Sequence, residues 1–292
     1  MSFALAQIVC LLLMTADMIA RTWRIMWLLR GIGQTVTFAD ALVLNVFGDA
    51  AAALTPARLG GEPARFAGML RAGVPPEESV VAISYEVAAA WPVIIGFGAL
   101  LTWAFAPEWL ATTGPAFLSA AASMWPWLVA VGVATVLAAF LARRLAGRWA
   151  HRLRRPARRL KSVWRRMPPG PLLASVPMTL VNLVTRTAIL PVLAMTLVDP
   201  PAMGPVALGA FALLYSQLVL PTPAGIGGVE FGFLAGAAGS FGAAEGMLLL
   251  LWRFYTVGLG AVLGGYFLVR LYGWPAAKRL VFGGQAPAPA SE

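Results

Sequence analysis

Long apolar runs divide this sequence and limit what it can fold into. A helix needs roughly 20 apolar residues to cross the hydrocarbon layer of a bilayer. The chain has 292 residues, of which 60% are hydrophobic and 12% charged. Its apolar runs do not alternate between polar and apolar positions as the strands of a membrane barrel do. We therefore predict an all-α, polytopic helical membrane protein. The runs lie near residues 3–20, 36–54, 77–105, 122–141, 172–198, 204–221 and 246–270.

A phrase that breaks helices occurs twice in the chain. Residues 54–62 read LTPARLGGE and residues 221–230 read PTPAGIGGVE, so that the pattern TPA-x-[LI]-GG recurs at an offset of 167. The same offset, without gaps, aligns Phe66 with Phe233 and Glu78 with Glu245. The match predicts two repeats, at about 36–105 and 203–272, within one transmembrane domain at 1–280. Residues 281–292 are predicted to be a disordered tail.

Basic residues predict how the repeats are oriented. Segment 142–168 holds 11 of the 22 lysines and arginines and no acidic residue, which is typical of a cytoplasmic loop and not of a specific nucleic-acid site. Lys278 and Arg279 favour a cytoplasmic C-terminus. Arginines that follow the first run, Arg21, Arg24 and Arg30, favour a cytoplasmic first loop. With these ends fixed, each repeat must contain a re-entrant hairpin that turns at its TPA phrase, and the two repeats have inverted topology.

The repeated phrase can serve as a hinge inside the membrane. Proline ends a helix and glycine lets the backbone turn at low steric cost. The backbone groups freed in this way are tolerated at membrane depth only where they pack in protein or line a wet cavity. Broken helices that meet near the midplane are typical of transporters. The predicted hinge residues are Pro56, Gly60, Gly61, Pro223, Gly225, Gly227 and Gly228.

Charged and polar residues gather around the two phrases and inside the predicted spans. A charge in a span needs a partner, water or a ligand, so we predict that they bind substrate in an interior cavity. The candidates are Asp49, Arg58, Glu62, Arg65, Glu86, Arg186, Gln217, Glu230 and Arg253. Glu86 and Arg253, at similar depths in their helices, could pair across the pseudo-symmetry axis. Instead of binding substrate, Glu62 and Glu230 could cap the helices that they begin. The arginines within the spans could form structural ion pairs. Asp17 is expected near the membrane interface.

Several segments resemble a known family. RTWRIMWLL, TPARLGGEPAR, the acidic SYE helix and LPTPAGIGGVE together are similar to the flippase-like membrane domain of lysylphosphatidylglycerol synthases, over about residues 3–272. The resemblance implies lipid translocation between leaflets, with Glu62, Glu86, Glu230 and Arg253 at family-type polar positions. Val87 and Ala90 depart from the family pattern after Glu86. The full synthases also carry a soluble aminoacyl-transfer domain, so this chain is not expected to make aminoacylated lipid itself.

These observations predict a lipid flippase-like transporter of the cytoplasmic membrane rather than an enzyme. No GxxxxGK[ST] phrase for ATP is present. With one cysteine, Cys10, and one histidine, His151, the sequence predicts neither a metal site nor a cofactor. The expected partners are membrane lipids with an anionic or aminoacylated headgroup, and an oligomer is allowed. The alternatives are a membrane scaffold or accessory subunit and, less favoured, an enzyme of the lipid-carrier glycosyltransferase type.

Overall fold

The computed structural model is helical wherever it describes the chain. It describes residues 1–112, 168–218, 222–234 and 241–272, with residues 162–164, residue 220 and single positions between 115 and 144. Every regular element in these parts is a helix, which confirms the all-α prediction. Some predicted features lie outside the described residues, namely most of the span at 122–141, most of the basic loop at 142–168 and the tail at 281–292.

Within the described chain, four helical stretches are long and apolar enough to cross a membrane. They are α1 (Phe3–Gly31), α4 (Pro76–Thr112), α6 (Pro169–Ala194) and a composite helix. The composite helix joins η2 (Gly242–Ala244), α9 (Glu245–Arg253), the π-turn η3 (Phe254–Gly258) and α10 (Leu259–Tyr272). At about 1.5 Å per residue, each of them exceeds the roughly 30 Å of a hydrocarbon core.

The first helix is longer than its apolar run. It continues without a break to Gly31, so that Arg21 and Arg24 lie inside α1 and Arg30 lies in its last turn. The prediction that these arginines form a loop after the first helix is therefore wrong. The helix continues through them because the guanidinium groups of Arg21 and Arg24 are neutralised by carboxylates in the protein interior.

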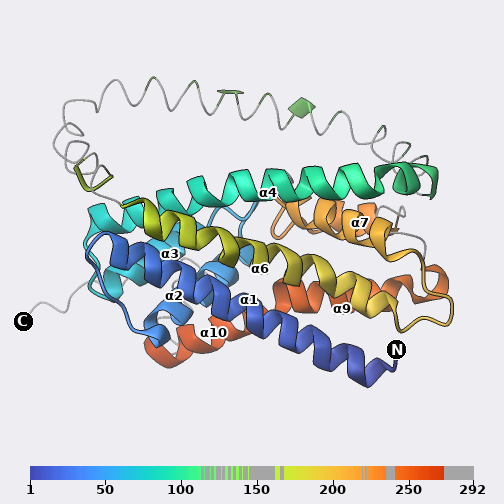
Figure 1. Cartoon of the computed structure of the whole chain (residues 1–292), viewed down its shortest axis with the longest axis horizontal. Helices are drawn as coiled ribbons and strands as arrows, with labels where there is room; N and C mark the ends of the chain where they lie inside the picture. The colour runs from blue at the N-terminus through green and yellow to red at the C-terminus, as the bar shows by residue number, and fades with distance from the viewer. Residues whose placement is uncertain are drawn as a thin grey trace, which may run out of the picture.

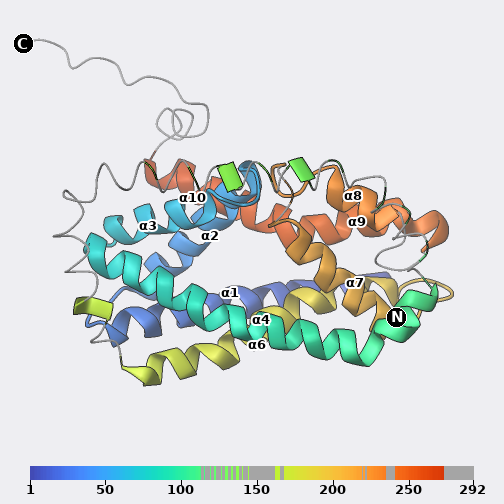
Figure 2. The same cartoon turned by 90° about the horizontal axis from the view of Figure 1, so that it is seen from above.

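Four other helices are too short to cross. They are α2 (Phe38–Leu54), α3 (Gly61–Arg71), α7 (Met203–Ser216) and α8 (Gly228–Gly232). The helices α2 and α3 lie in one half of the molecule, beside the end where α1 finishes, and α7 and α8 lie in the other half (Figures 1 and 2). Each pair is joined by one copy of the TPA phrase. Both connections lie near the middle of the molecule, where the two halves meet (Figures 1 and 2).

The two phrases begin with the same turn and differ at its last residue, where Gly60 has a φ of −74° and Gly227 one of 88°. Ala57 and Arg58 have positive φ angles of 49° and 58°, and their counterparts Ala224 and Gly225 have φ angles of 50° and 70°. The backbone hydrogen bonds recur at the same offset: Arg58 to Thr55 (3.3 Å) and Leu59 to Pro56 (3.0 Å) in the first turn, Gly225 to Thr222 (3.1 Å) and Ile226 to Pro223 (2.9 Å) in the second. The turns also touch, because Pro56 and Pro223 form an isolated antiparallel bridge.

The chemistry of the first phrase explains its turn. Thr55, which precedes Pro56, is extended (φ −113°, ψ 145°), as expected of a residue before proline, and α2 therefore ends at Leu54. The Thr55 hydroxyl donates to the Ala51 carbonyl and accepts the Gly60 amide, both at 2.8 Å. A Cβ at Gly60 would lie 2.7 Å from the Thr55 side chain, so this close approach requires glycine.

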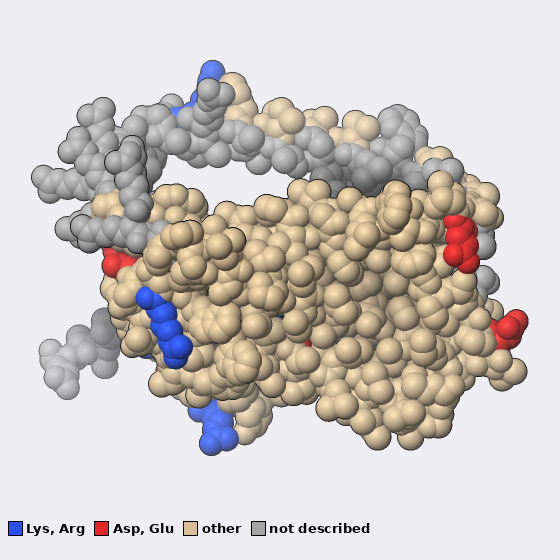
Figure 3. All heavy atoms as spheres, viewed as in Figure 1, with Lys and Arg blue, Asp and Glu red and all other residues tan. Residues whose placement is uncertain are grey.

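Two apolar cores lie at opposite ends of the helical bundle. One is built around the aromatic rings of Trp252, Phe233 and Phe241 and packs against α1, α6 and α7. The other joins α1, α2 and α3 through Ile25, Leu44, Met69 and their neighbours. The exterior is also apolar over its broad middle, and the charged residues visible in Figure 3 lie toward the two ends. An apolar belt between charged ends is what a membrane-spanning protein presents to lipid.

Candidate functional site

A half-open cavity of about 330 Å³ lies between the helices, next to the first turn. We call it the charged cavity, because arginine and carboxylate side chains dominate its lining. Helices α1, α2, α3, α4 and α6 and the end of α7 all contribute to it. Its charged and amide residues are Arg21, Arg24, Asn45, Asp49, Arg58, Glu62, Arg65, Glu86, Asn182 and Arg186.

Glu86 of α4 joins three helices at one wall of the cavity. Its side chain is buried, and its two carboxylate oxygens accept hydrogen bonds from Arg24 of α1 and Arg65 of α3. Arg24 also donates to the Thr179 hydroxyl of α6 at 3.1 Å. Arg65 reaches both oxygens of Glu62, one turn earlier in α3, at 3.2 Å. These ion pairs hold α1, α3 and α4 around the cavity.

Asp17 and Asp49 form a second group of ion pairs. Asp49 of α2 accepts two hydrogen bonds from Arg21, at 2.9 and 2.7 Å, in the two-pronged geometry that suits a guanidinium. Asp17, which is fully buried, accepts from Arg186 at 3.1 Å and from Asn182, and lies 3.1 Å from Arg21. The expectation that Asp17 lies near the membrane interface is wrong. It lies in the interior because two arginines and an amide surround it.

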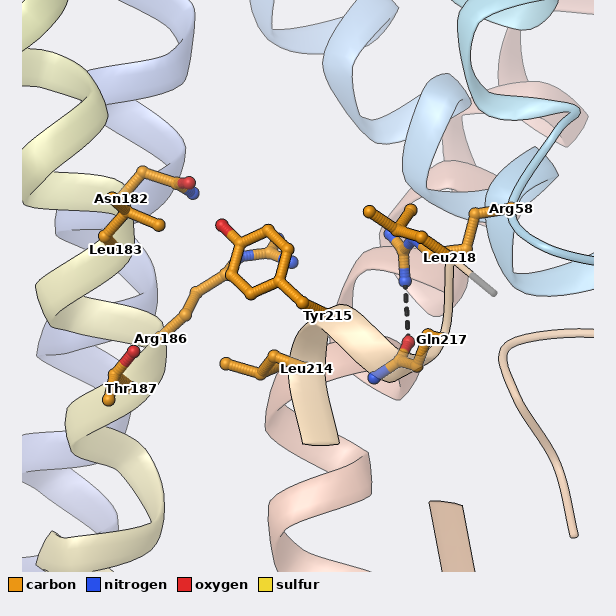
Figure 4. Close-up of a pocket in the computed structure, with 9 residues that line it drawn as sticks. All are labelled: Arg58, Asn182, Leu183, Arg186, Thr187, Leu214, Tyr215, Gln217 and Leu218. Atoms are coloured by element: carbon orange, nitrogen blue, oxygen red, sulfur yellow. Dashed lines mark hydrogen bonds between the residues drawn. The ribbon is translucent and has the colours of Figure 1, made fainter. Parts of the chain in front are cut away.

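Arg58 differs from the other arginines of the cavity. Its side chain donates to the Gln217 amide oxygen at 3.1 Å, and no described carboxylate lies within ion-pair distance of it. In Figure 4, Arg58 approaches from the first turn and Arg186 from α6, and the ring of Tyr215 overlaps the end of the Arg186 side chain in this view. These residues line a side pocket of about 110 Å³, which shares five lining residues with the charged cavity.

The charge of the cavity is not balanced. Its lining contains five arginines and three carboxylates: Arg21, Arg24, Arg58, Arg65 and Arg186, and Asp49, Glu62 and Glu86. A fourth carboxylate, Asp17, binds two of these arginines from behind the lining. Five positive and four negative charges leave a formal charge of +1. Four buried donors of lining residues have no hydrogen-bond partner among the described residues, namely the Nε atoms of Arg21, Arg24 and Arg65 and the amide nitrogen of Asn45. Buried donors without partners are costly, so the cavity favours an anionic group that accepts hydrogen bonds.

Arg253 and Glu230 form a separate group at the second turn. Arg253 donates to Glu230 at 2.7 Å and to the backbone carbonyls of Ala224 and Gly225 at 2.9 and 3.4 Å. Glu230 also accepts the Gly227 amide at 2.7 Å, which is the capping role considered for it. Neither residue lines the charged cavity or its side pocket. The pair fastens the second turn to the composite helix, directly before the π-turn η3.

The structure thus brings most of the predicted residues together. Six of them line the charged cavity, and the seventh, Gln217, lines the side pocket; the six are Asp49, Arg58, Glu62, Arg65, Glu86 and Arg186. The pairing of Glu86 with Arg253 is wrong, since Glu86 binds Arg24 and Arg65, whereas Arg253 binds Glu230. Each of these carboxylates has a nearer arginine in its own half of the molecule.

Sequence reasoning missed the contribution of α1. Asp17, Arg21 and Arg24 are spaced i, i+4 and i+7, which places them on one face of a helix. Asn45 and Asp49 of α2, and Asn182 and Arg186 of α6, show the same four-residue spacing. These three polar stripes point to a common interior. The spacing was the signal available in the sequence.

Comparison with known proteins identifies the family. No curated protein and no solved structure matches the chain. The sequence model of one family, described as the lysylphosphatidylglycerol synthase TM region, matches residues 2–264. Those residues include both TPA phrases and every charged residue of the cavity described above. The chain is thus a multi-pass membrane protein that belongs to the family of the lysylphosphatidylglycerol synthase TM region.

Proposed function

We propose that this chain moves a phospholipid between the leaflets of the cytoplasmic membrane, with the lipid headgroup passing through the charged cavity. The observation that carries the proposal is the half-open cavity itself, with its unbalanced positive charge and the unpartnered donors in its wall, beside two turns that touch. Family membership supports a lipid as the substrate, because the family description names a lipid synthase. On this proposal the chain is a transporter and not an enzyme.

Two re-entrant hairpins in inverted repeats form the framework of the proposal. Helices α2 and α7 have 17 and 14 residues, which at about 1.5 Å each cannot cross roughly 30 Å of hydrocarbon. The α2–α3 hairpin starts and ends in one half of the molecule, and α7–α8 in the other. The matching φ angles and hydrogen bonds of the two turns support a duplicated unit. Leu59 and Ile226, at equivalent positions of the turns, are both exposed, as suits contact with lipid tails.

The sidedness of the proposal follows from the charges at the two ends. The exposed arginines Arg30, Arg71 and Arg270 lie near the ends of α1, α3 and α10, which point toward the same side of the molecule in Figure 1. The exposed acids Glu108 and Asp199 lie at the opposite side, near the end of α4 and in the α6–α7 connection. By the positive-inside rule the arginine side is cytoplasmic.

Arg58 is the residue that we assign to the phosphate of the headgroup. It is the cavity arginine without a carboxylate partner in the described chain. It also lines the side pocket together with Arg186. A guanidinium binds a phosphate through two parallel hydrogen bonds. Arg186, which also lines the side pocket, would add a second guanidinium, so most of the negative charge of the headgroup would be met inside the protein.

An exchange assay on Arg58→Gly tests the proposal. Purified protein in liposomes is supplied with acyl-labelled fluorescent phosphatidylglycerol, and dithionite reports the label that reaches the outer leaflet. Loss of a charge-assisted hydrogen bond costs about 1.5–3 kcal/mol, so exchange should fall about ten- to a hundredfold. Glycine accepts the positive φ of Arg58, and the fold should therefore survive.

The matched control is Ala57→Gly. Ala57 shares the positive φ of its neighbour but carries no charge, so this variant relaxes the same turn without removing a guanidinium. It should exchange lipid at the wild-type rate. Equal rates in wild type and Arg58→Gly would remove Arg58 from the mechanism, and a wild-type rate no faster than that of protein-free liposomes would end the transport proposal.

A further inference from the structure

The outer surface carries a shallow groove that shares the side chain of Glu62 with the charged cavity. We propose that the lipid enters the protein sideways from the bilayer through this groove, between α3 and α4. The inference rests on the proposed function and adds the route by which the headgroup arrives. The groove has a volume of about 400 Å³ and is lined by Glu62, Pro63 and Phe66 of α3 and by Val80, Ile83 and Ser84 of α4.

The lining of the outer groove suits a lipid. Pro63, Phe66, Val80 and Ile83 are apolar and offer contact to acyl chains. The Ser84 hydroxyl donates to the Val80 carbonyl of its own helix at 2.7 Å and so presents no free donor to the groove. Glu62 is the charged member of the lining. Its carboxylate repels a phosphate, so an anionic headgroup can pass along the groove only when Glu62 turns aside.

Glu62 connects the groove with the charged cavity, since its side chain lines both. The side chain is 50% exposed, whereas that of its partner Arg65 is 11% exposed. Arg65 also binds the buried carboxylate of Glu86 and keeps this ion pair when Glu62 moves away. Displacement of this half-exposed carboxylate then leaves Glu86 shared between Arg24 and Arg65, which adds to the positive charge that receives an anion. That makes Glu62 the gate of the outer groove.

A second groove on the opposite face of α3 is the rival route. This α2–α10 groove is larger, about 460 Å³, and is lined by apolar residues such as Phe47, Leu54 and Ala67. It shares no lining residue with the charged cavity. Helices α2 and α3 close the space between them, because a Cβ at Gly61 would lie 3.2 Å from the Ala52 side chain and 3.3 Å from the Gly48 carbonyl. The larger groove therefore does not lead inward.

Three tryptophan substitutions separate the routes. Ser84→Trp fills the outer groove from α4, and Val80→Trp, one turn earlier, is a second variant in case the first does not fold. Ala67→Trp, on the same α3 helix but in the α2–α10 groove, is the matched control. In the exchange assay with fluorescent phosphatidylglycerol, the outer-groove variants should slow by about tenfold or more, because a bulky side chain must be displaced at each passage. The control should stay close to the wild-type rate.

Native mass spectrometry of the same variants with added phosphatidylglycerol gives a readout that does not depend on transport. Wild type and Ala67→Trp should retain bound lipid, and the outer-groove variants should lose it. The route is overturned if folded Ser84→Trp and Val80→Trp bind and exchange lipid like wild type, or if Ala67→Trp is the impaired variant. If wild type retains lipid without exchanging it, the transport proposal fails, and the binding pattern still decides between the two grooves.

Discussion

At the scale of single residues, Glu86 illustrates how buried charges are kept inside this bundle. One carboxylate contacts two guanidinium groups, and each comes from a different helix. A buried ion pair adds little stability compared with an apolar contact, but removing one partner leaves the other charged and unpaired. The side chains around Glu86 are thus interdependent. A substitution at Glu86 should remove an ion-pair partner from both Arg24 and Arg65.

Glu86→Gln should lower the free energy of unfolding by about 3–5 kcal/mol, since two buried arginines lose their common partner. Glu62→Gln is the control, because Glu62 binds one of the same arginines from a half-exposed position. Its loss should cost about 1 kcal/mol or less. Thermal unfolding of both variants in detergent measures the difference. Similar melting temperatures for the two variants would contradict the central role given to Glu86.

At the scale of elements, close packing of α2 against α10 fixes the first hairpin. A Cβ at Gly264 of α10 would lie 2.2 Å from the Val46 carbonyl of α2, and one at Gly260 would lie 2.9 Å from the Asp49 Cβ. These helices approach closely because the glycines present no side chain, as in other membrane helix pairs. The position of Asp49, and with it one wall of the charged cavity, depends on this approach.

Gly264→Val should therefore separate α2 from α10. The neighbour is backbone and cannot move aside, so the expected loss is about 1–3 kcal/mol of unfolding free energy. Gly265→Val is the control, since a Cβ at Gly265 meets nothing within 4 Å. Resistance to heat and to protease in detergent should fall in the first variant and remain in the second. Equal behaviour of the two variants would show that this contact is not needed.

The elements also show what the sequence could predict. Pro56 sits in the turn directly after α2, as the residue type requires, whereas α7 already ends at Ser216, before the turn that holds Pro223. The hydrogen bonds of the two turns recur at the predicted offset. The end of α1 could not be predicted from hydropathy, because Arg21 and Arg24 lower the local average and their partners lie on other helices. Likewise, the choice of Arg24 and Arg65 as partners of Glu86 depends on which helices are neighbours, and no pattern within one helix contains that information.

At the scale of the whole molecule, the proposed topology places the two hairpins on opposite sides of the membrane. The exposed residue Arg71 follows the first hairpin, and Val198 precedes the second. Single cysteines at these positions, in a Cys10→Ala background, should react with an impermeant maleimide from opposite sides. Arg71→Cys should be labelled from the cytoplasm and Val198→Cys from outside.

The control for the labelling is an unaltered chain, since Cys10 is buried and should not react. A cysteine in place of Thr35, an exposed residue in the α1–α2 connection, should follow Arg71→Cys, because the first hairpin starts and ends on one side. Labelling of Arg71→Cys and Val198→Cys from the same side would rule out the inverted arrangement while leaving the cavity chemistry untouched.

The two turns match in shape up to their last residue but not in charge, because the position of Arg58 in one is held by Gly225 in the other. A protein made of two equivalent halves could rest equally well facing either compartment. Here a change from one facing to the other would separate Arg58 from Gln217. The second turn carries no guanidinium that could make the equivalent contact. On the proposed mechanism, the inward-facing and outward-facing forms therefore differ in energy even when empty, and the transport cycle has one preferred resting orientation.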